Sequence, residues 1–414
     1  MRISAPLKNR SESTPRPPAA LSAFLALACG LVAANIYYAQ PLAALISASA
    51  GLSAQATGLI VTFTQLGYGL GLLLIVPLGD LVESRKLASR VLAMGALALL
   101  MMSLAGSATV LLLCAFLVGL GSVTVQILVP YASYLAAAPH RGRVVGNVMA
   151  GLMLGIMLAR PVASLIAYAT SWEMVFRLSS VLMAALVVVL NLVLPKRLPE
   201  PGLCATVLFR SMASLLRHNR VLQRKAAYHA CMFAAFSFFW TTIPLLLASA
   251  PLALNQADIA LFALVGVSGA VAAPVAGRLA DKGLSRPVTV AVLAVAGGVL
   301  VLGSFSFTDQ RLELALLGGV AIVLDFCVAA NLVLGQRALF CLDAALRSRL
   351  NGLYMSIFFA GGALGSAGGA WLYSRYGWQV SALAAAALPG IALCYSLFDI
   401  QPGDTSPTST SPQR

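Results

Sequence analysis

Hydrophobic residues run along this chain in long blocks, and charged residues, prolines or short polar clusters separate one block from the next. A helix needs about 20 mostly apolar residues to cross a bilayer, so blocks of this length predict membrane-spanning helices. We expect six in each half of the chain, at 20–46, 56–76, 87–107, 110–135, 144–169 and 173–194, and then at 226–248, 258–276, 288–306, 314–338, 351–373 and 378–398. The pattern predicts an all-α integral membrane protein with twelve transmembrane helices.

The segments between and beside these blocks divide the chain into parts. We expect an N-terminal tail (1–19), a six-helix bundle (20–194), a basic central loop (195–225), a second six-helix bundle (226–398) and a C-terminal tail (399–414). A cleaved signal peptide is the alternative for the first block, but this block is longer than a signal peptide's apolar core and ends in polar residues. We therefore expect it to be retained as a helix.

Composition excludes a soluble protein. Hydrophobic residue types make up 60% of the chain and charged residues 10%, whereas a soluble domain carries about a quarter charged residues. Twelve spans leave room for little but loops, so the chain has no room for a separate catalytic domain. Within the spans, no nucleophile with a neighbouring base marks a catalytic site. The seven cysteines form no CxxC pair. We expect no enzymatic activity, no metal site and no cofactor.

The formal net charge of +14 follows the predicted topology. Lysines and arginines concentrate in the tails, the central loop and every second connection, while Arg177, Arg311 and Arg375 lie in the connections between. Because basic residues remain on the cytoplasmic side, both termini are predicted to be cytoplasmic. This distribution also accounts for the charge without nucleic-acid binding.

An internal repeat links the two halves of the chain. At a single offset, five residues of the first half match five of the second: Arg143, Gly146, Met149, Gly155 and Trp172 correspond to Arg349, Gly352, Met355, Gly361 and Trp378. Six helices separate the copies, so the halves share one orientation. Such repeats are related by an axis along the membrane normal, as in transporters built from two bundles.

Several motifs resemble those of the major facilitator superfamily of secondary transporters. They are GRLADKGLSR (277–286) and its weaker partner VPLGDLVESRK (76–86), within the six-plus-six layout. More narrowly, NIYYAQPL (35–42), TQLGYGLGLL (64–73), the Arg160-Pro161 pair and RSRLNGLYM (347–355) look like those of bacterial drug or sugar efflux permeases. The resemblance implies two bundles related by pseudo-two-fold symmetry, in a bacterial inner membrane.

The same resemblance implies a conformational gate in two of the loops. The residues that match it are Asp80, Arg85, Lys86, Asp281 and Arg286. An acid at a helix end can bind backbone donors and basic groups of a neighbouring helix, and would hold the bundles together on the cytoplasmic side. The alternative is that these loops only set topology.

Two groups of glycines predict close helix packing. Gly146, Gly151 and Gly155 lie in the fifth predicted helix, and Gly361, Gly365 and Gly369 follow each other at spacings of four in the eleventh. Such faces let a second helix approach closely. A dinucleotide-binding loop would need a preceding strand, which the pattern does not predict.

Two charges fall inside predicted spans. Asp325 lies about 11 residues into the tenth helix, near the midplane, so it should face a polar cavity, form a pair or carry a proton. Arg160 lies about 16 residues into the fifth helix, in the outer part of the membrane. Arg160 either extends toward the headgroups or holds an anionic partner or substrate.

Other polar and aromatic residues are weaker candidates for a substrate cavity. The resemblance implies a cavity lined by the first, fourth, seventh and tenth helices. Candidates on these helices are Asn35, Tyr38, Gln40, Gln126, Trp240 and Asn331. If their side chains face inward, the cavity suits an amphipathic or aromatic solute; the alternative is that the aromatic rings face lipid or the core. None of the three histidines is predicted to be a relay at the midplane.

The sequence thus predicts a monomeric secondary transporter that exchanges a small amphipathic compound, and protons, across the inner membrane. Proton-coupled efflux by alternating access is the leading mode. The alternatives are import by proton symport or facilitated diffusion and, from another class, a receptor that does not transport.

Overall fold

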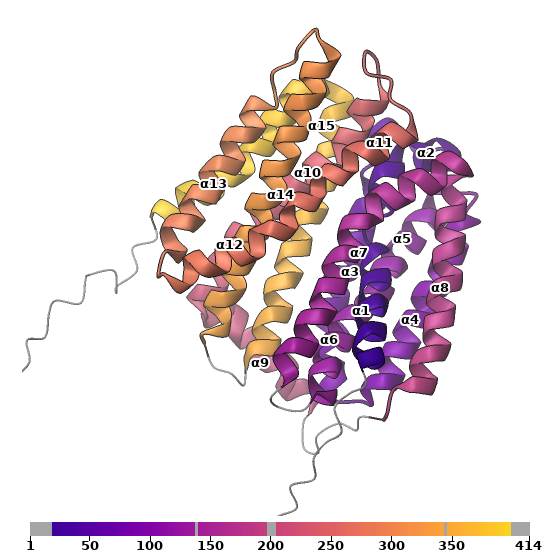
Figure 1. Ribbon diagram of the computed structural model, residues 1–414, viewed down its shortest axis with the longest axis vertical. Coiled ribbons are helices and arrows are strands. Elements are labelled where there is room, and N and C mark those ends of the chain that lie inside the picture. The colour runs from indigo at the N-terminus through magenta and orange to yellow at the C-terminus, as the bar shows by residue number, and fades with distance from the viewer. Residues whose placement is uncertain (1–18, 137–139, 197–203, 343–345, 399–414) are drawn as a thin grey trace, which may run out of the picture.

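The computed structural model describes residues 19–136, 140–196, 204–342 and 346–398, and these residues form helices joined by turns (Figure 1). The predicted tails fall outside this range, apart from Ala19. The first group of helices consists of α1 (Ala19–Ala34), α2 (Ala39–Ala50), α3 (Leu59–Leu74), α4 (Ser84–Ser103), α5 (Ala108–Ser122), α6 (Thr124–Leu135), α7 (Arg141–Ala169) and α8 (Trp172–Val193). Short 3-10 turns, η1 (Ala54–Ala56) and η2 (Val76–Asp80), flank α3. We call α1 to α8 the N-terminal half.

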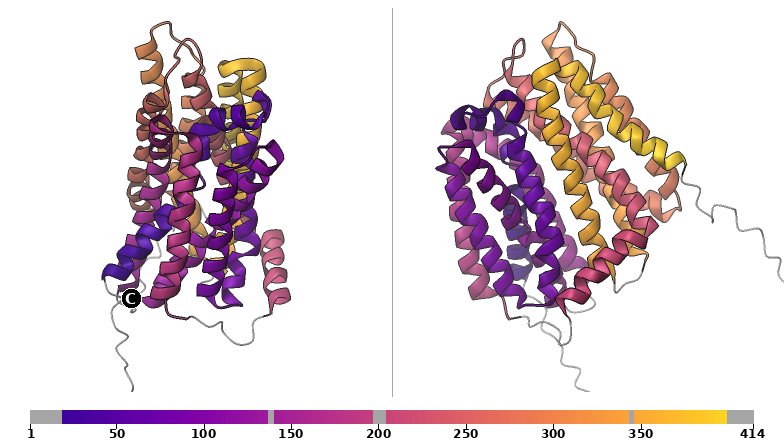
Figure 2. Two further views of the ribbon diagram at one scale, coloured as in Figure 1. Left: turned by 90° about the vertical axis from the view of Figure 1, so that its right-hand side faces the viewer. Right: turned by 180° about the vertical axis from the view of Figure 1, so that it is seen from behind.

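The second group follows a short helix, α9 (Ala205–His218). It consists of α10 (Arg220–Ala248), α11 (Gln256–Ala263), η4 (Leu264–Ser268), α12 (Gly269–Asp281), α13 (Ser285–Leu302), α14 (Gln310–Phe340) and α15 (Arg347–Leu397). We call α10 to α15 the C-terminal half. Figure 2 shows the two halves side by side, the first in indigo to magenta and the second in pink to yellow.

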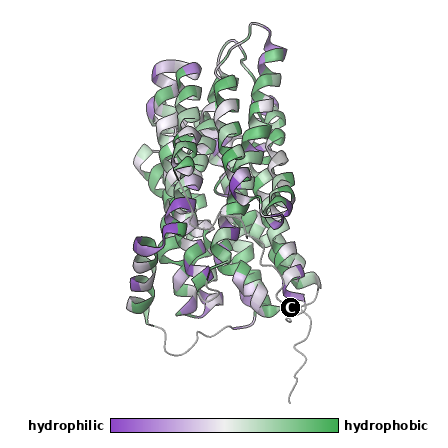
Figure 3. Cartoon of the chain, turned by 90° about the vertical axis from the view of Figure 1, so that its left-hand side faces the viewer, coloured by the Kyte–Doolittle hydropathy of each residue, from purple (hydrophilic) through white to green (hydrophobic). Residues whose placement is uncertain are grey.

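The expected number of spans is present in the described residues. Ten helices are long and apolar enough to cross a membrane, and α1 with α2 makes an eleventh span bent by 42°. Helix α15 contains two spans, because Gly377 adopts φ 75° and ψ −172° and divides it into two arms. This left-handed φ suits glycine, which has no Cβ to clash. Figure 3 shows hydrophobic residues along most of the length of the helices, as a lipid-facing surface requires.

The first span is broken where the sequence predicted one continuous helix. Between α1 and α2 the backbone makes tighter turns, in which Ile36 N–H donates to the Ala33 carbonyl at 3.3 Å and Tyr37 N–H to the Ala34 carbonyl at 3.0 Å. Pro41, in the first turn of α2, has no N–H to contribute to a continuous helix. The bend turns the start of α2 toward the interior, where Gln40 is fully buried.

Helix α9 lies within the segment that the sequence predicted to be a basic loop. Its buried residues, Leu208 and Met212, lie one turn apart, and its exposed residues include the basic Arg210 and Arg217. Such a short amphipathic helix has no long apolar block and is missed by a search for spans. Arg349 of α15 donates to Ser211 of α9 at 3.0 Å, which holds α9 against the C-terminal half.

The contact between the two halves includes three pairs of α-helices, together with η1 on α15 and η4 on α7. Helix α3 packs on the first arm of α15, α7 packs on α11, and α2 packs on α10. In the first interface, Thr62 and Ser366 share a hydrogen bond of 2.8 Å, and the Ser356 hydroxyl donates to the Gly69 carbonyl at 2.8 Å. Thr62 and Ser366 are buried, so this interface is closed to water.

Candidate functional site

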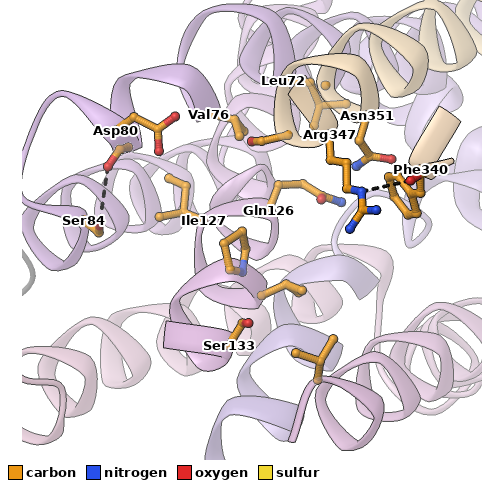
Figure 4. A pocket seen from close by; sticks show the side chains of 16 residues that line it. Leu72, Val76, Asp80, Ser84, Gln126, Ile127, Ser133, Phe340, Arg347 and Asn351 are labelled. Atoms are coloured by element: carbon orange, nitrogen blue, oxygen red, sulfur yellow. Dashed lines mark hydrogen bonds between the residues drawn. The ribbon is translucent and has the colours of Figure 1, made fainter. Parts of the chain in front are cut away.

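A cavity of about 690 Å³ lies between the halves, at the end where α4 and α7 begin (Figure 4). We call this the basic end, because Arg85, Arg141 and Arg347 lie there. The N-terminal half contributes Asp80 and Gln126 to the lining, and the C-terminal half contributes Arg347. The remaining lining residues are mostly apolar, so the cavity combines an apolar wall with a few polar groups, as small-molecule sites do.

Aromatic residues of both halves lie next to this lining. Gln126 donates a hydrogen bond to the Tyr68 hydroxyl at 3.1 Å. The Tyr68 ring packs against Phe359 of α15, with ring centroids 4.4 Å apart. Phe359 in turn contacts Phe233 and Phe358. These rings form a contact between the halves beside the polar group that Gln126 presents to the cavity.

Asp325 is buried halfway along α14 and binds an indole. Its Oδ1 accepts a hydrogen bond from Trp240 Nε1 of α10 at 2.8 Å, and 6% of the residue is exposed. Gly266 of η4 leaves room for the carboxylate, because a Cβ at that position would lie 2.8 Å from Asp325 Oδ2. A charged carboxylate at this depth is costly, which is why intramembrane acids are usually functional.

Arg160 faces the interior of the protein. Only 3% of the residue is exposed, and its Nε donates to Gln40 Oε1 at 2.7 Å. The guanidinium carbon lies 4.2 Å from the Trp240 ring centroid and 5.2 Å from those of Tyr37 and Phe236. The side chain therefore does not extend toward the headgroups in this structure; cation–π contacts surround it.

Trp240 brings the two intramembrane charges into one cluster. The guanidinium of Arg160 lies over its ring, and the carboxylate of Asp325 accepts from its N–H edge. Arg160 and Gln40 belong to the N-terminal half, whereas Trp240 and Asp325 belong to the C-terminal half. The cluster is therefore divided between the two bodies, and we call these four residues the Arg160–Asp325 cluster.

The remaining candidates on the first helix lie apart from this cluster. Asn35 accepts a hydrogen bond from Ser179 of α8 at 2.5 Å, a contact within the N-terminal half. Tyr38 lines an apolar groove of about 410 Å³ between α1 and α7. Leu27 and Leu154, which also line it, are largely exposed. This groove therefore opens onto the surface expected to face lipid.

A second buried polar pair involves a histidine that the sequence gave no reason to select. Asn331 of α14 contacts His229 Nδ1 at 2.9 Å, and His229 is fully buried. Its imidazole stacks on Tyr354 and Phe358, with centroids 5.2 and 4.4 Å apart. The sequence places Asn331 and His229 at a similar depth in their helices. That alone does not show that α10 and α14 lie side by side, which only the fold reveals.

Asp281, Arg85 and Lys86 of the expected gate make contacts within their own halves. Asp281 forms an ion pair of 2.5 Å with Arg337 of α14. Arg85 caps the end of α8 by donating to the Asn191 and Leu194 carbonyls at 3.2 and 3.1 Å. Glu83 pairs with Arg85 and Lys86, Asp80 lines the cavity, and Arg286 is exposed at the start of α13.

Five of the six expected packing glycines make close contacts. A Cβ on Gly155 would lie 2.1 Å from the Gly30 carbonyl of α1, and one on Gly151 would lie 2.4 Å from that of Ala26. On α15, Gly361 and Gly365 approach backbone atoms of α10 equally closely, and Gly369 contacts Phe238. Gly146 is exposed and has no such neighbour.

Comparison with known proteins places the chain among membrane transporters. The family model described as Major Facilitator Superfamily matches residues 25–345. The "Uncharacterized transporter YgaY" of Escherichia coli O157:H7 is 39% identical over 371 residues, which cover 89% of this chain and 93% of that protein.

Solved structures share the fold at low sequence identity. The crystal structure of a D-xylose-proton symporter has a TM-score of 0.71 at 17% identity and covers 92% of this chain and 98% of its own. A bacterial homologue of the human lysosomal transporter Spinster, in an inward-facing and unoccupied conformation, has a TM-score of 0.71 at 13% identity. It covers 91% of this chain and 96% of its own.

Proposed function

This chain belongs to the major facilitator superfamily, and we propose that it is a proton-coupled secondary transporter of a small amphipathic compound. The observation that carries the proposal is the Arg160–Asp325 cluster, in which a buried carboxylate and a buried cation belong to different halves. Such a site changes its surroundings whenever the halves move against each other. A protonatable group placed there can couple proton binding to that movement.

Asp325 is the residue that we assign to the proton. It lies in the interior of a span, where a neutral carboxylic acid is far less costly than a carboxylate. Trp240 and Arg160 offset the charge in the state described here. Movement of the halves takes Arg160, which belongs to the N-terminal half, away from Asp325 and favours uptake of a proton.

The cavity supports alternating access. It opens between the halves at the basic end, while α3 and the first arm of α15 form a buried, hydrogen-bonded contact. We propose that the basic end faces the cytoplasm of a bacterium, because basic segments remain on that side. On this assignment both termini are cytoplasmic, and 20–194 and 226–398 move as the two bodies.

We propose efflux as the first candidate mode, on the motifs that resemble bacterial efflux permeases. Proton symport into the cell is the second candidate, and the buried Arg160 favours it. In efflux by antiport, substrate and proton compete; in symport they bind together. A receptor that does not transport would bind ligand without moving it, so a transport measurement excludes it directly.

The test begins with deletion and overexpression strains screened against toxic compounds and metabolites. A compound whose tolerance or uptake changes is then followed in vesicles of known orientation under an imposed pH gradient. Asp325→Asn should abolish gradient-driven transport and retain exchange of substrate for substrate, because exchange needs movement of the halves but no net proton transfer. Full gradient-driven transport by this variant would overturn the assignment of the proton.

A further inference from the structure

Arg160 has hydrogen-bonding capacity that the protein does not use. In the described part of the chain, its Nη2 is buried without a hydrogen-bond partner, and none of the ion pairs found there includes Arg160. Asp325 interacts with it electrostatically, but the carboxylate is hydrogen-bonded to Trp240. A buried guanidinium is costly unless acceptors satisfy its donors.

Gln40 presents a second unused donor beside the first. Its Oε1 accepts from Arg160 Nε at 2.7 Å, so the amide nitrogen is its remaining group. That nitrogen, Nε2, is buried and has no hydrogen-bond partner among the residues that the structure describes. Nε and Nη2 form one edge of the guanidinium fork, and this edge matches the two oxygens of a carboxylate. Gln40 thus occupies half of a bidentate edge and adds a donor next to it.

We propose that Arg160 and Gln40 form a subsite for the carboxylate of an amphipathic organic anion. The rings of Tyr37, Phe236 and Trp240, which now lie around the guanidinium, hold its apolar part. Buried donors gain most from a charged acceptor, because hydrogen bonds to ions are about twice as strong as neutral ones. The aromatic rings explain why the anion is amphipathic and not an inorganic ion.

The division of the cluster explains how the anion gains access. Arg160 and Gln40 lie on α7 and α2, whereas Phe236 and Trp240 lie on α10. When the halves separate at the end opposite the basic end, the α10 rings leave the guanidinium and the two donors face the opening. When the halves close, the same rings cover the bound molecule.

This inference rests on the proposed transport function and specifies its substrate and coupling. Among the described residues, the ionisable groups that interact with Asp325 are Arg160 of α7 and Tyr37 of the turn between α1 and α2. With Asp325 ionised, its charge balances that of Arg160. A proton on Asp325 leaves one positive charge, which a monoanion then neutralises. Each therefore favours binding of the other, since coupling between two ligands is reciprocal. That sign corresponds to symport.

The experiment measures binding to the full-length protein in lipid nanodiscs by titration calorimetry. The probes are benzoate, 4-phenylbutyrate and octanoate, each compared with its neutral amide. We expect wild-type protein to bind at least one carboxylate at least tenfold more tightly than the matching amide. Arg160→Gln should reduce that preference to less than twofold. Arg177→Gln, which removes an exposed arginine of the same half, should keep the wild-type preference.

A second variant separates binding from folding. Gln40→Glu places a carboxylate on the guanidinium, so we expect higher thermal stability together with loss of the preference for carboxylate probes. Equal binding of every carboxylate and its amide by wild-type protein would overturn the proposal. So would a preference retained in Arg160→Gln, or a Gln40→Glu protein of unchanged or lower stability.

The outcomes also separate this inference from the proposed function. If the protein prefers carboxylates but a pH gradient has no effect on transport, the subsite proposal is supported and proton coupling is contradicted. If the protein shows no carboxylate preference but moves a cationic compound in a proton-driven way, the proposed transport function is supported and the carboxylate subsite is contradicted.

Discussion

Two glycines on the same helix should respond in opposite directions to the same substitution. In Gly155→Ala, the new Cβ would lie 2.1 Å from the Gly30 carbonyl oxygen and 2.4 Å from the Gly30 Cα. Carbon atoms normally pack about 3.5–4.0 Å apart, and backbone atoms cannot rotate away. Helices α1 and α7 must therefore separate by more than about 1 Å, and such overpacking costs about 1–3 kcal/mol of unfolding free energy.

Gly146→Ala is the matched control, because Gly146 is exposed on the same helix and no atom of the described residues beyond its own helix lies within 4 Å of its Cβ position. It should gain up to about 1 kcal/mol from higher helix propensity. Reversible unfolding in mixed detergent micelles, followed by circular dichroism, measures both values. Shifts in the same direction would refute the backbone contact between α1 and α7. On α15, Gly365→Ala should destabilise and Gly368→Ala should not, for the same reasons.

Three further predictions concern transport and topology. Asp325→Asn should retain substrate exchange and lose gradient-driven transport by at least about tenfold, measured in vesicles; equal loss of both activities would indicate a structural defect instead. Asp80→Asn and Asp281→Asn should lower turnover more than substrate binding, since a gate sets the rate of movement; unchanged turnover in both and in the double variant would return these loops to topology alone. Reporter fusions after Arg217 should give a cytoplasmic signal and fusions after Thr308 a periplasmic one; a periplasmic signal at Arg217 would contradict the assigned orientation.

Long apolar blocks were enough to predict the spans, because crossing a bilayer requires about 20 mostly apolar residues in a row and other elements rarely have runs of that length. They could not predict the bend between α1 and α2, since Asn35 to Tyr38 fit a continuous apolar block nearly as well as a turn. Helix α9 was also missed, because its amphipathic pattern covers only four turns. The sequence therefore predicted the spans better than it predicted the breaks and short helices between them.

The candidate site shows a different limit. Counting residues along each helix put Arg160 and Asp325 at different depths, and it gave no reason to bring them together. The structure joins them through Trp240, whose ring is large enough to contact a cation on its face and a carboxylate at its edge. Contacts between α7, α10 and α14 depend on how the helices pack, which a single sequence does not specify. The roles of these residues remain predictions.

The contact between α3 and the first arm of α15 bears on leakage. Thr62, Ser366 and Ser356 exchange their hydrogen bonds across it with the opposite half. A small separation would break these bonds without admitting water. Thr62 and Ser366 would keep bonds to the Gly58 and Ala363 carbonyls of their own helices, but the Ser356 hydroxyl would lose the Gly69 carbonyl, at a cost of about 1–3 kcal/mol. Partly open arrangements are therefore less stable than either a closed contact or a wide, hydrated one. The seam behaves as an all-or-none seal, which limits the time during which solutes or ions could pass from one side of the membrane to the other.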